Sequence, residues 1–142
     1  MIEIINRQKK RLGNNLLRQG VKKILKSLGI SSGSVSLVFC GRGFIRQLNR
    51  KAFGCDNPTD VIAFPLADRY DDSIGEVIVC VPEAVAAAPE YGHTWQEELW
   101  LYIIHGILHL LGYKDGTKKE RARMEKKQNA LLTLITLKRY QG

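Results

Sequence analysis

Short runs of β-branched and apolar residues, separated by turn-forming residues, predict four strands. The runs lie around Ile2 and Ile4 and over residues 34–40, 61–64 and 75–81. The last run is apolar at nearly every position, which is typical of a strand buried on both faces in the middle of a sheet.

Apolar residues at helical spacing predict five helices between and after these strands. The helices are expected at about residues 11–28, 42–53, 82–90 and 95–111, with a last one beginning after residue 117. Gly29 and Gly112 suit helix ends, and the Thr-x-x-Glu sequences at Thr94 and Thr117 are capping boxes. Together these elements predict an α+β fold in which about five helices pack around a small mixed four-stranded sheet.

Length and composition agree with a globular chain. Of its 142 residues, 44% are hydrophobic and 25% are charged, so we expect one domain over residues 1–142 with a packed core. No apolar run reaches the roughly 18 residues that a membrane-spanning helix needs, and the amino terminus lacks the layout of a secretory signal. We therefore expect a cytosolic protein without a membrane partner.

The three cysteines, Cys40, Cys55 and Cys80, are odd in number and widely separated. They contain no Cys-x-x-Cys pair, so neither a disulfide framework nor a thiolate zinc cluster is indicated. We expect all three to be small buried hydrophobic residues.

Basic residues outnumber acidic ones by 22 to 14, which gives a formal net charge of +8. A surplus of this size favours polyanionic partners such as RNA, but it also occurs on proteins that are merely soluble. In the second expected helix, Arg42, Arg46 and Arg50 recur every four residues opposite the apolar face. This arginine stripe is either a solvated helix face or a weak RNA contact.

A candidate metal site lies near the end of the helix expected over residues 95–111. His105 and His109 project from one face about one turn apart, and Gly112 permits a reversal that returns the Asp115 carboxylate from the far side. Such a tripod leaves one position of a tetrahedral ion to water, as in catalytic zinc sites. We predict one divalent metal on these three residues, with zinc as the expected ion, although the ligands also suit iron, manganese or nickel.

The histidine pair is also compatible with a site that holds no metal and with a protease. Histidines spaced by four residues on an apolar helix occur as a satisfied interior pair without any ion. Zincin metalloproteases use the same spacing, but their general base is a glutamate directly after the first histidine. Here that position is Gly106, so the protease interpretation lacks its catalytic base.

Three sequence blocks resemble the YbeY family. Residues 105–113, HGILHLLGY, are similar to its signature His-Gly-x-Leu-His-Leu-x-Gly-Tyr-Asp-His. Residues 58–65, PTDVIAFP, preceded by Leu48-Asn49 and Asp56, resemble a second block, and residues 75–79, GEVIV, resemble a third. The blocks follow the family's order and spacing, so the likeness covers most of the chain from about Leu37 onward.

The resemblance implies a metal-dependent endoribonuclease that acts on single-stranded RNA. Its expected roles are maturation of ribosomal RNA, notably at the 3′ end of the small-subunit RNA, and ribosome quality control, with ribosomal RNA and the small subunit as partners. The family's first two histidine ligands fall on His105 and His109, and its third falls by spacing on Asp115, which makes these the expected catalytic residues. The alternative is a non-catalytic ribosome-assembly factor that binds RNA and uses the metal structurally.

The chain departs from the family's pattern in two of these blocks. Lys114 and Asp115 stand where the family has Asp-His, and a one-residue insertion would instead place Asp115 on the aspartate and leave the tripod incomplete. We prefer the ungapped alignment. Phe53 occupies the position of an arginine to which a role in cleavage is attributed, and Arg46 or Arg50, one or two turns earlier, is a candidate replacement.

Overall fold

A mixed four-stranded sheet forms the centre of the computed structural model, which describes residues 1–65 and 73–141, with side chains described as far as residue 136. The strand order is β1-β2-β4-β3. The first three strands in this order are parallel, and β3 pairs with β4 in the antiparallel sense. The strands are β1 (Ile2–Asn6), β2 (Ser34–Cys40), β3 (Val61–Pro65) and β4 (Ser73–Cys80).

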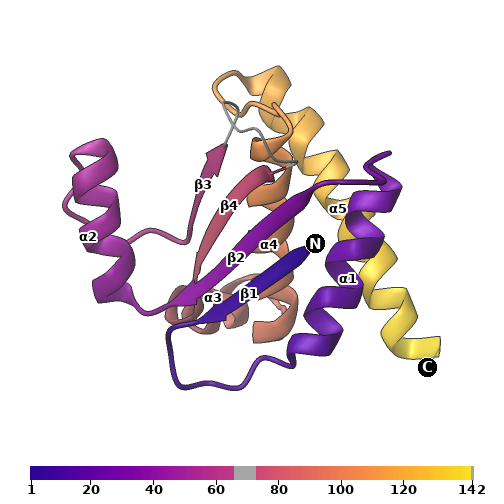
Figure 1. Ribbon diagram of the computed structural model, residues 1–142, viewed down its shortest axis with the longest axis horizontal. Coiled ribbons are helices and arrows are strands. Elements are labelled where there is room, and N and C mark those ends of the chain that lie inside the picture. Colours follow the sequence, from indigo (N-terminus) through magenta and orange to yellow (C-terminus); the bar gives the residue numbers. More distant parts are fainter. Residues whose placement is uncertain (66–72, 142) are drawn as a thin grey trace.

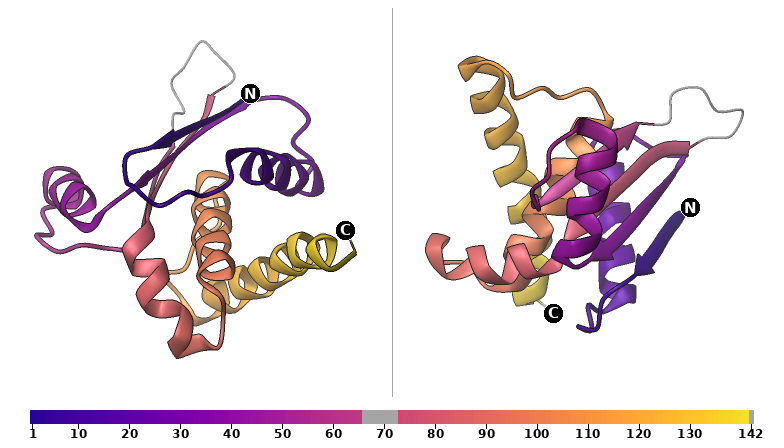
Figure 2. Two further views of the ribbon diagram at one scale, coloured as in Figure 1. Left: turned by 90° about the horizontal axis from the view of Figure 1, so that it is seen from below. Right: turned by 90° about the vertical axis from the view of Figure 1, so that its left-hand side faces the viewer.

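Helices cover both faces of this sheet (Figure 1, Figure 2). α2 lies on one face, while α1, α4 and α5 lie on the other, and α3 with a short 3₁₀ segment leads from β4 to α4. The helices are α1 (Asn14–Ser27), α2 (Arg42–Phe53), α3 (Val81–Ala87), α4 (Trp95–Leu110) and α5 (Lys118–Gln141), and the 3₁₀ segment is η1 (Ala88–Tyr91). Within the described residues the predicted α+β fold is confirmed.

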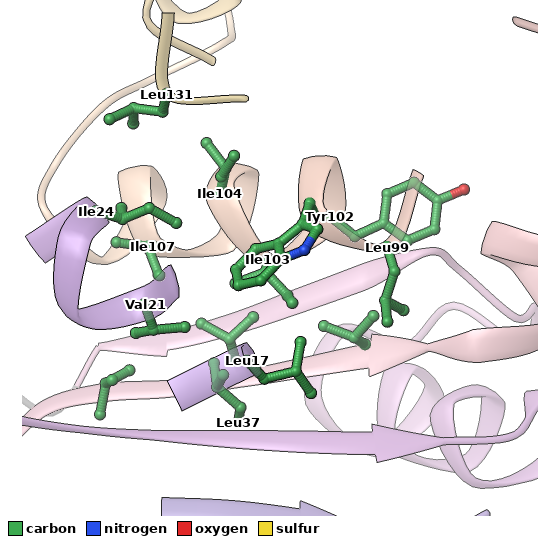
Figure 3. Close-up of a cluster of buried hydrophobic side chains, with 14 of the residues drawn as sticks. Leu17, Val21, Ile24, Leu37, Leu99, Tyr102, Ile103, Ile104, Ile107 and Leu131 are labelled. Atoms are coloured by element: carbon green, nitrogen blue, oxygen red, sulfur yellow. The ribbon is translucent and has the colours of Figure 1, made fainter. Parts of the chain in front are cut away.

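The larger hydrophobic core surrounds α4. Four residues of this helix, Ile103, Ile104, Ile107 and Leu108, are fully buried between the sheet and the neighbouring helices. Figure 3 shows side chains of α1, β2 and α5 converging on the same cluster. β4 contributes Val77 and Val79 to this core and Ile78 and Cys80 to a smaller core beneath α2. The predicted burial of this strand on both faces is therefore confirmed.

Both predicted capping boxes are present. Thr94 and Glu97 close the start of α4. At the start of α5, the amide of Thr117 donates to Glu120 Oε1 at 3.0 Å and the amide of Glu120 donates to Thr117 Oγ1 at 3.1 Å. These reciprocal bonds satisfy amides that a helix start leaves without intrahelical partners.

Three local predictions need correction. The first helix begins at Asn14 and not at residue 11, because Gly13 has a left-handed φ of 76° that no α-helix continues through. The expected helix over 82–90 changes to 3₁₀ geometry at Ala88, next to Pro89, which has no amide hydrogen to continue the α-helical ladder. Cys55 is exposed, whereas Cys40 and Cys80 are buried as predicted.

None of the helices in the described part of the chain combines the length and the hydropathy that crossing a membrane requires.

Candidate metal centre

Two histidines share one face at the C-terminal end of α4. The rings of His105 and His109 meet edge to face with their centroids 4.5 Å apart. The helix ends at Leu110, and Gly112 adopts a left-handed φ of 95°, a conformation that L side chains rarely adopt. The chain reverses there and returns Asp115 toward the histidines.

The three side chains converge as a metal site requires. Asp115 Oδ2 lies 3.4 Å from His109 Nε2 and 3.8 Å from His105 Nε2, and the two Nε2 atoms are 3.0 Å apart. Ligand atoms around a tetrahedral zinc ion lie roughly 3.3–3.6 Å from one another. The three observed distances, from 3.0 to 3.8 Å, span this range. The structure thus brings the three predicted residues together, and metal ligation itself stays a prediction.

Hydrogen bonds fix which nitrogen of each ring faces this point. His105 Nδ1 lies 3.0 Å from Gln128 Oε1, and His109 Nδ1 lies 3.0 Å from the backbone oxygen of Tyr113. Both oxygens are acceptors, so a neutral ring that donates from Nδ1 presents the lone pair of its Nε2 at this point. Two nitrogen lone pairs and the Asp115 carboxylate therefore face one another, an arrangement that a shared cation stabilises.

The site combines support from the core with access to solvent. The side chains of His105 and His109 are 31% and 29% exposed, and that of Asp115 is 49% exposed. Gln128 comes from α5 and Tyr113 from the connecting loop, so three separate segments hold the two rings and the carboxylate. A partly exposed tripod of this kind can leave one metal position to solvent or substrate.

Gly106 faces the sheet and not the metal site. A Cβ atom at this position would overlap Val77 Cγ1 and would lie 3.3 Å from Val61 Cγ2. The close approach of α4 to β3 and β4 therefore leaves no room for the glutamate that a zincin carries after its first histidine. The sequence shows that the zincin general base is missing at position 106, and the structure shows that a side chain there would overlap Val77.

A cleft of about 370 Å³ adjoins the triad. His109 forms part of its wall, together with Asn49 and Phe53 from α2, Thr59 from the following loop, and residues of β3. The Phe53 ring lies parallel to that of Phe64, with an interplanar angle of 3° and centroids 6.1 Å apart. A cleft lined by apolar, aromatic and polar side chains thus opens directly beside one candidate metal ligand.

Comparison with known proteins identifies the family. The sequence model of the family described as Endoribonuclease YbeY matches residues 3–136. The chain belongs to the YbeY family. A relative from Carboxydothermus hydrogenoformans, named Endoribonuclease YbeY, is 36% identical over 126 residues, covering 88% of this chain and 87% of that relative. Another from Acholeplasma laidlawii, with the same name, is 39% identical over 106 residues, covering 75% and 77%.

A solved structure shares the fold of this YbeY chain. The solution structure of a protein from Thermotoga maritima matches with a TM-score of 0.69 and 33% sequence identity. The match covers 95% of this chain and 89% of that one. The predicted family and fold class are therefore both confirmed.

Two arginines of the stripe on α2, Arg42 and Arg46, form ion pairs within this chain. Arg42 Nε lies 2.7 Å from Glu83 Oε1, and Arg46 donates to both carboxylate oxygens of Asp56 at 3.0 and 3.2 Å. The hydrogen bond from Arg46 holds the pKa of Asp56 below its usual value, and the charge of Arg50 acts in the same direction. Arg46 thus holds the loop after α2 through Asp56. Contact between the arginine stripe and RNA stays a prediction.

Sequence reasoning missed Gln128 and the cleft. Gln128 follows the buried Met124 by four residues and precedes the buried Leu131 by three. This spacing places it on the inner face of α5, where a polar residue needs a partner. No comparable signal marks the cleft, because its walls come from segments far apart in the sequence.

Proposed function

We propose that this chain is a metal-dependent endoribonuclease that cleaves single-stranded RNA and acts in ribosomal RNA maturation, notably at the 3′ end of the small-subunit RNA, and in ribosome quality control. Membership of the YbeY family supports the reaction class, since relatives carry the name Endoribonuclease YbeY. The observation that carries the metal dependence is the convergence of two imidazole Nε2 atoms and one carboxylate. We propose zinc as the ion, held by His105, His109 and Asp115.

Each residue of the site has a distinct task in this proposal. When bound, the ion would supply positive charge to a phosphoryl oxygen and acidify the attacking hydroxyl. Gln128 and the Tyr113 carbonyl keep the Nδ1 protons in place, so both rings stay oriented. The nucleophile is either water or the ribose 2′-hydroxyl, and only the latter produces cyclic phosphate ends and spares DNA.

Basic side chains surround the loop that carries Asp115. Arg121 Nη1 lies 3.3 Å from the Asp115 carbonyl oxygen, and the Arg123 guanidinium lies 5.5 Å from the centre of the Tyr113 ring. Lys114, Tyr113 and Arg123 also line a second hollow of about 300 Å³. These cations support binding of the phosphate backbone of a polyanionic substrate next to the proposed metal.

The experiment compares cleavage by the zinc-loaded wild type with cleavage by His109→Ala and Asp115→Ala. An unstructured RNA and its DNA counterpart serve as substrates, and Glu125→Ala, which removes another exposed carboxylate on α5, is the matched control. We expect both ligand variants to lose bound zinc and RNA cleavage while keeping their circular dichroism spectrum, and the control to retain both. Cleavage by Asp115→Ala at the wild-type rate would overturn the proposed tripod.

A structural metal is the second candidate, and one observation favours it. The bond between His105 and Gln128 ties the metal site to α5, so an ion there also joins the last two helices. A non-catalytic RNA-binding assembly factor with such an ion would lose its fold on His109→Ala and would show no cleavage in the wild type.

A further inference from the structure

Phe53 combines exposure with a fixed position. Phe53 is the last residue of α2 and is 57% exposed, although large aromatic side chains are usually well buried. Its ring is stacked in parallel on Phe64 of β3. The Phe53 ring therefore has a parallel aromatic neighbour while much of the residue is open to solvent.

Three contacts hold the segment after Phe53 in place. Gly54 has a left-handed φ of 71°, and its amide donates to the carbonyl of Arg50 at 2.9 Å. Arg46 holds Asp56 through two hydrogen bonds, and Asn49 Nδ2 donates to the carbonyl of Asn57 at 3.0 Å. The ring is thus preorganised, which lowers the entropy cost of binding a ligand against it.

The exposed ring lines the same cleft as His109. The cleft volume of about 370 Å³ lies within the range of small-ligand sites, about 300–1,000 Å³. Its other walls mix the apolar side chains of β3 with the polar side chains of Asn49 and Thr59. A flat ligand with a π face and polar edges matches such a lining.

We propose that Phe53 and this cleft form a subsite for one unpaired nucleobase of the RNA, stacked on the Phe53 ring next to the scissile phosphate. This inference rests on the function proposed above. Every base has a π face, so stacking on an aromatic side chain binds single strands with little sequence preference. A base inside a duplex is already stacked and paired on both sides, so the subsite selects for single-stranded RNA.

The subsite is tested with Phe53→Ala, Phe53→Trp and the control Tyr91→Ala. Tyr91 is 67% exposed on η1 and does not line the cleft. Stacking on one aromatic side chain contributes about 1–3 kcal/mol per base, so Phe53→Ala should weaken single-strand RNA binding about 5- to 150-fold. Phe53→Trp and Tyr91→Ala should bind within about threefold of the wild type.

A stacking-specific readout separates this role from a structural one. A single-stranded oligoribonucleotide carrying 2-aminopurine should lose fluorescence on binding to the wild type and to Phe53→Trp, but not to Phe53→Ala. Binding is measured in the presence of a chelator, which removes the proposed metal so that cleavage does not remove the probe, and thermal melting checks that each variant folds. Removing the base at the labelled position should weaken binding by the wild type and leave Phe53→Ala unchanged.

Failure of the base subsite and failure of the proposed nuclease function give different results. If the wild type cleaves RNA and Phe53→Ala has unchanged RNA affinity and an unchanged KM, the subsite is refuted while the proposed function stands. If 2-aminopurine quenching depends on Phe53 but the wild type cleaves no RNA, the nuclease proposal fails while base binding remains. Equal affinity of the wild type for single-stranded and duplex RNA would also overturn the subsite.

Discussion

Gln128 orients the ring of His105 from a second helix. Its Oε1 lies 3.0 Å from His105 Nδ1, and the Nε2 atom on the other side of the ring faces His109 and Asp115. The backbone oxygen of Tyr113 does the same for His109. A side chain from α5 and a carbonyl of the preceding loop therefore orient the two rings so that both Nε2 atoms face the same point.

Replacing Gln128 with alanine should weaken zinc binding. The His105 ring would lose the acceptor that fixes its orientation, and removal of such outer partners typically costs about 10- to 100-fold in metal affinity. Competition with a chromogenic chelator measures the affinity. Gln47→Ala, at an exposed position on α2, is the matched control and should bind zinc as the wild type does. Equal affinities for the two variants would contradict the assigned role of Gln128.

The cysteines should differ sharply in reactivity. Cys55 is exposed, whereas burial raises the pKa of the Cys40 thiol to about 12 and also raises that of Cys80. Only the thiolate reacts with iodoacetamide, so at pH 8 the folded protein should be alkylated at Cys55 alone, with the other two reacting after unfolding. Peptide mass mapping measures this, and rapid alkylation of Cys40 in the folded state would contradict it.

The raised pKa values of Cys40 and Cys80 predict how the free energy of unfolding changes with pH. The neutral thiols of Cys40 and Cys80 are favoured in the folded state, while unfolded thiols ionise near their ordinary pKa of 9.0. Their stabilising contribution is therefore complete below pH 9.0 and is lost as the pH rises toward the raised values.

At the scale of elements, the position of α4 depends on its close approach to β3 and β4. The helix is apolar on nearly every side and is covered by the sheet, α1, α3 and α5. Gly106 permits this approach, because its backbone packs directly on the side chains of Val77 and Val61. The two candidate metal-ligating histidines lie on either side of this contact along the same helix, so the packing also sets their position relative to the cleft.

Gly106→Ala should destabilise the protein despite the higher helix propensity of alanine. The added methyl group would overlap Val77 Cγ1, and overpacking of this kind typically costs about 1–3 kcal/mol. Gly43→Ala is the matched control, since this glycine of α2 has open space around it, and its substitution should stabilise the protein by up to about 1 kcal/mol. Urea unfolding measures both, and a stabilised Gly106→Ala would contradict the close approach.

At the scale of the whole molecule, the proposed metal joins segments that the fold otherwise connects through packing. His105 and His109 belong to α4, Asp115 to the following loop, and Gln128 to α5. The loop between α4 and α5 and the end of β3 lie on the same side of the molecule (Figure 1). The proposed catalytic end of the molecule is therefore the end at which the last two helices meet.

Zinc should raise the thermal stability of the wild type. An ion that binds only the folded chain adds about 2.7 kcal/mol to the free energy of unfolding when its concentration is 100 times Kd. Differential scanning calorimetry with and without zinc measures the change in Tm, and a chelator should reverse it. His105→Ala should show a much smaller shift, and an equal shift in this variant would place the ion elsewhere.

The sequence by itself determined the features that arise within a few residues of chain. Helical periodicity, two capping boxes and the glycine at φ 95° after α4 are local, because one turn of backbone sets which side chains and amides meet. The spacing of His105 and His109 belongs to the same class. The cysteines show the limit of such reasoning, since composition predicted burial for all three and Cys55 is exposed.

Only the tertiary structure decided the contacts between distant segments. The pairing of Gln128 with His105, the fit of Gly106 against Val77 and the cleft that brings Phe53 beside His109 all join residues more than 20 positions apart. Such contacts depend on how helices pack on the sheet, which a periodic pattern does not specify. The three candidate metal ligands were therefore predicted from one helix and its loop, whereas the cleft beside them arises from the packing of the whole fold.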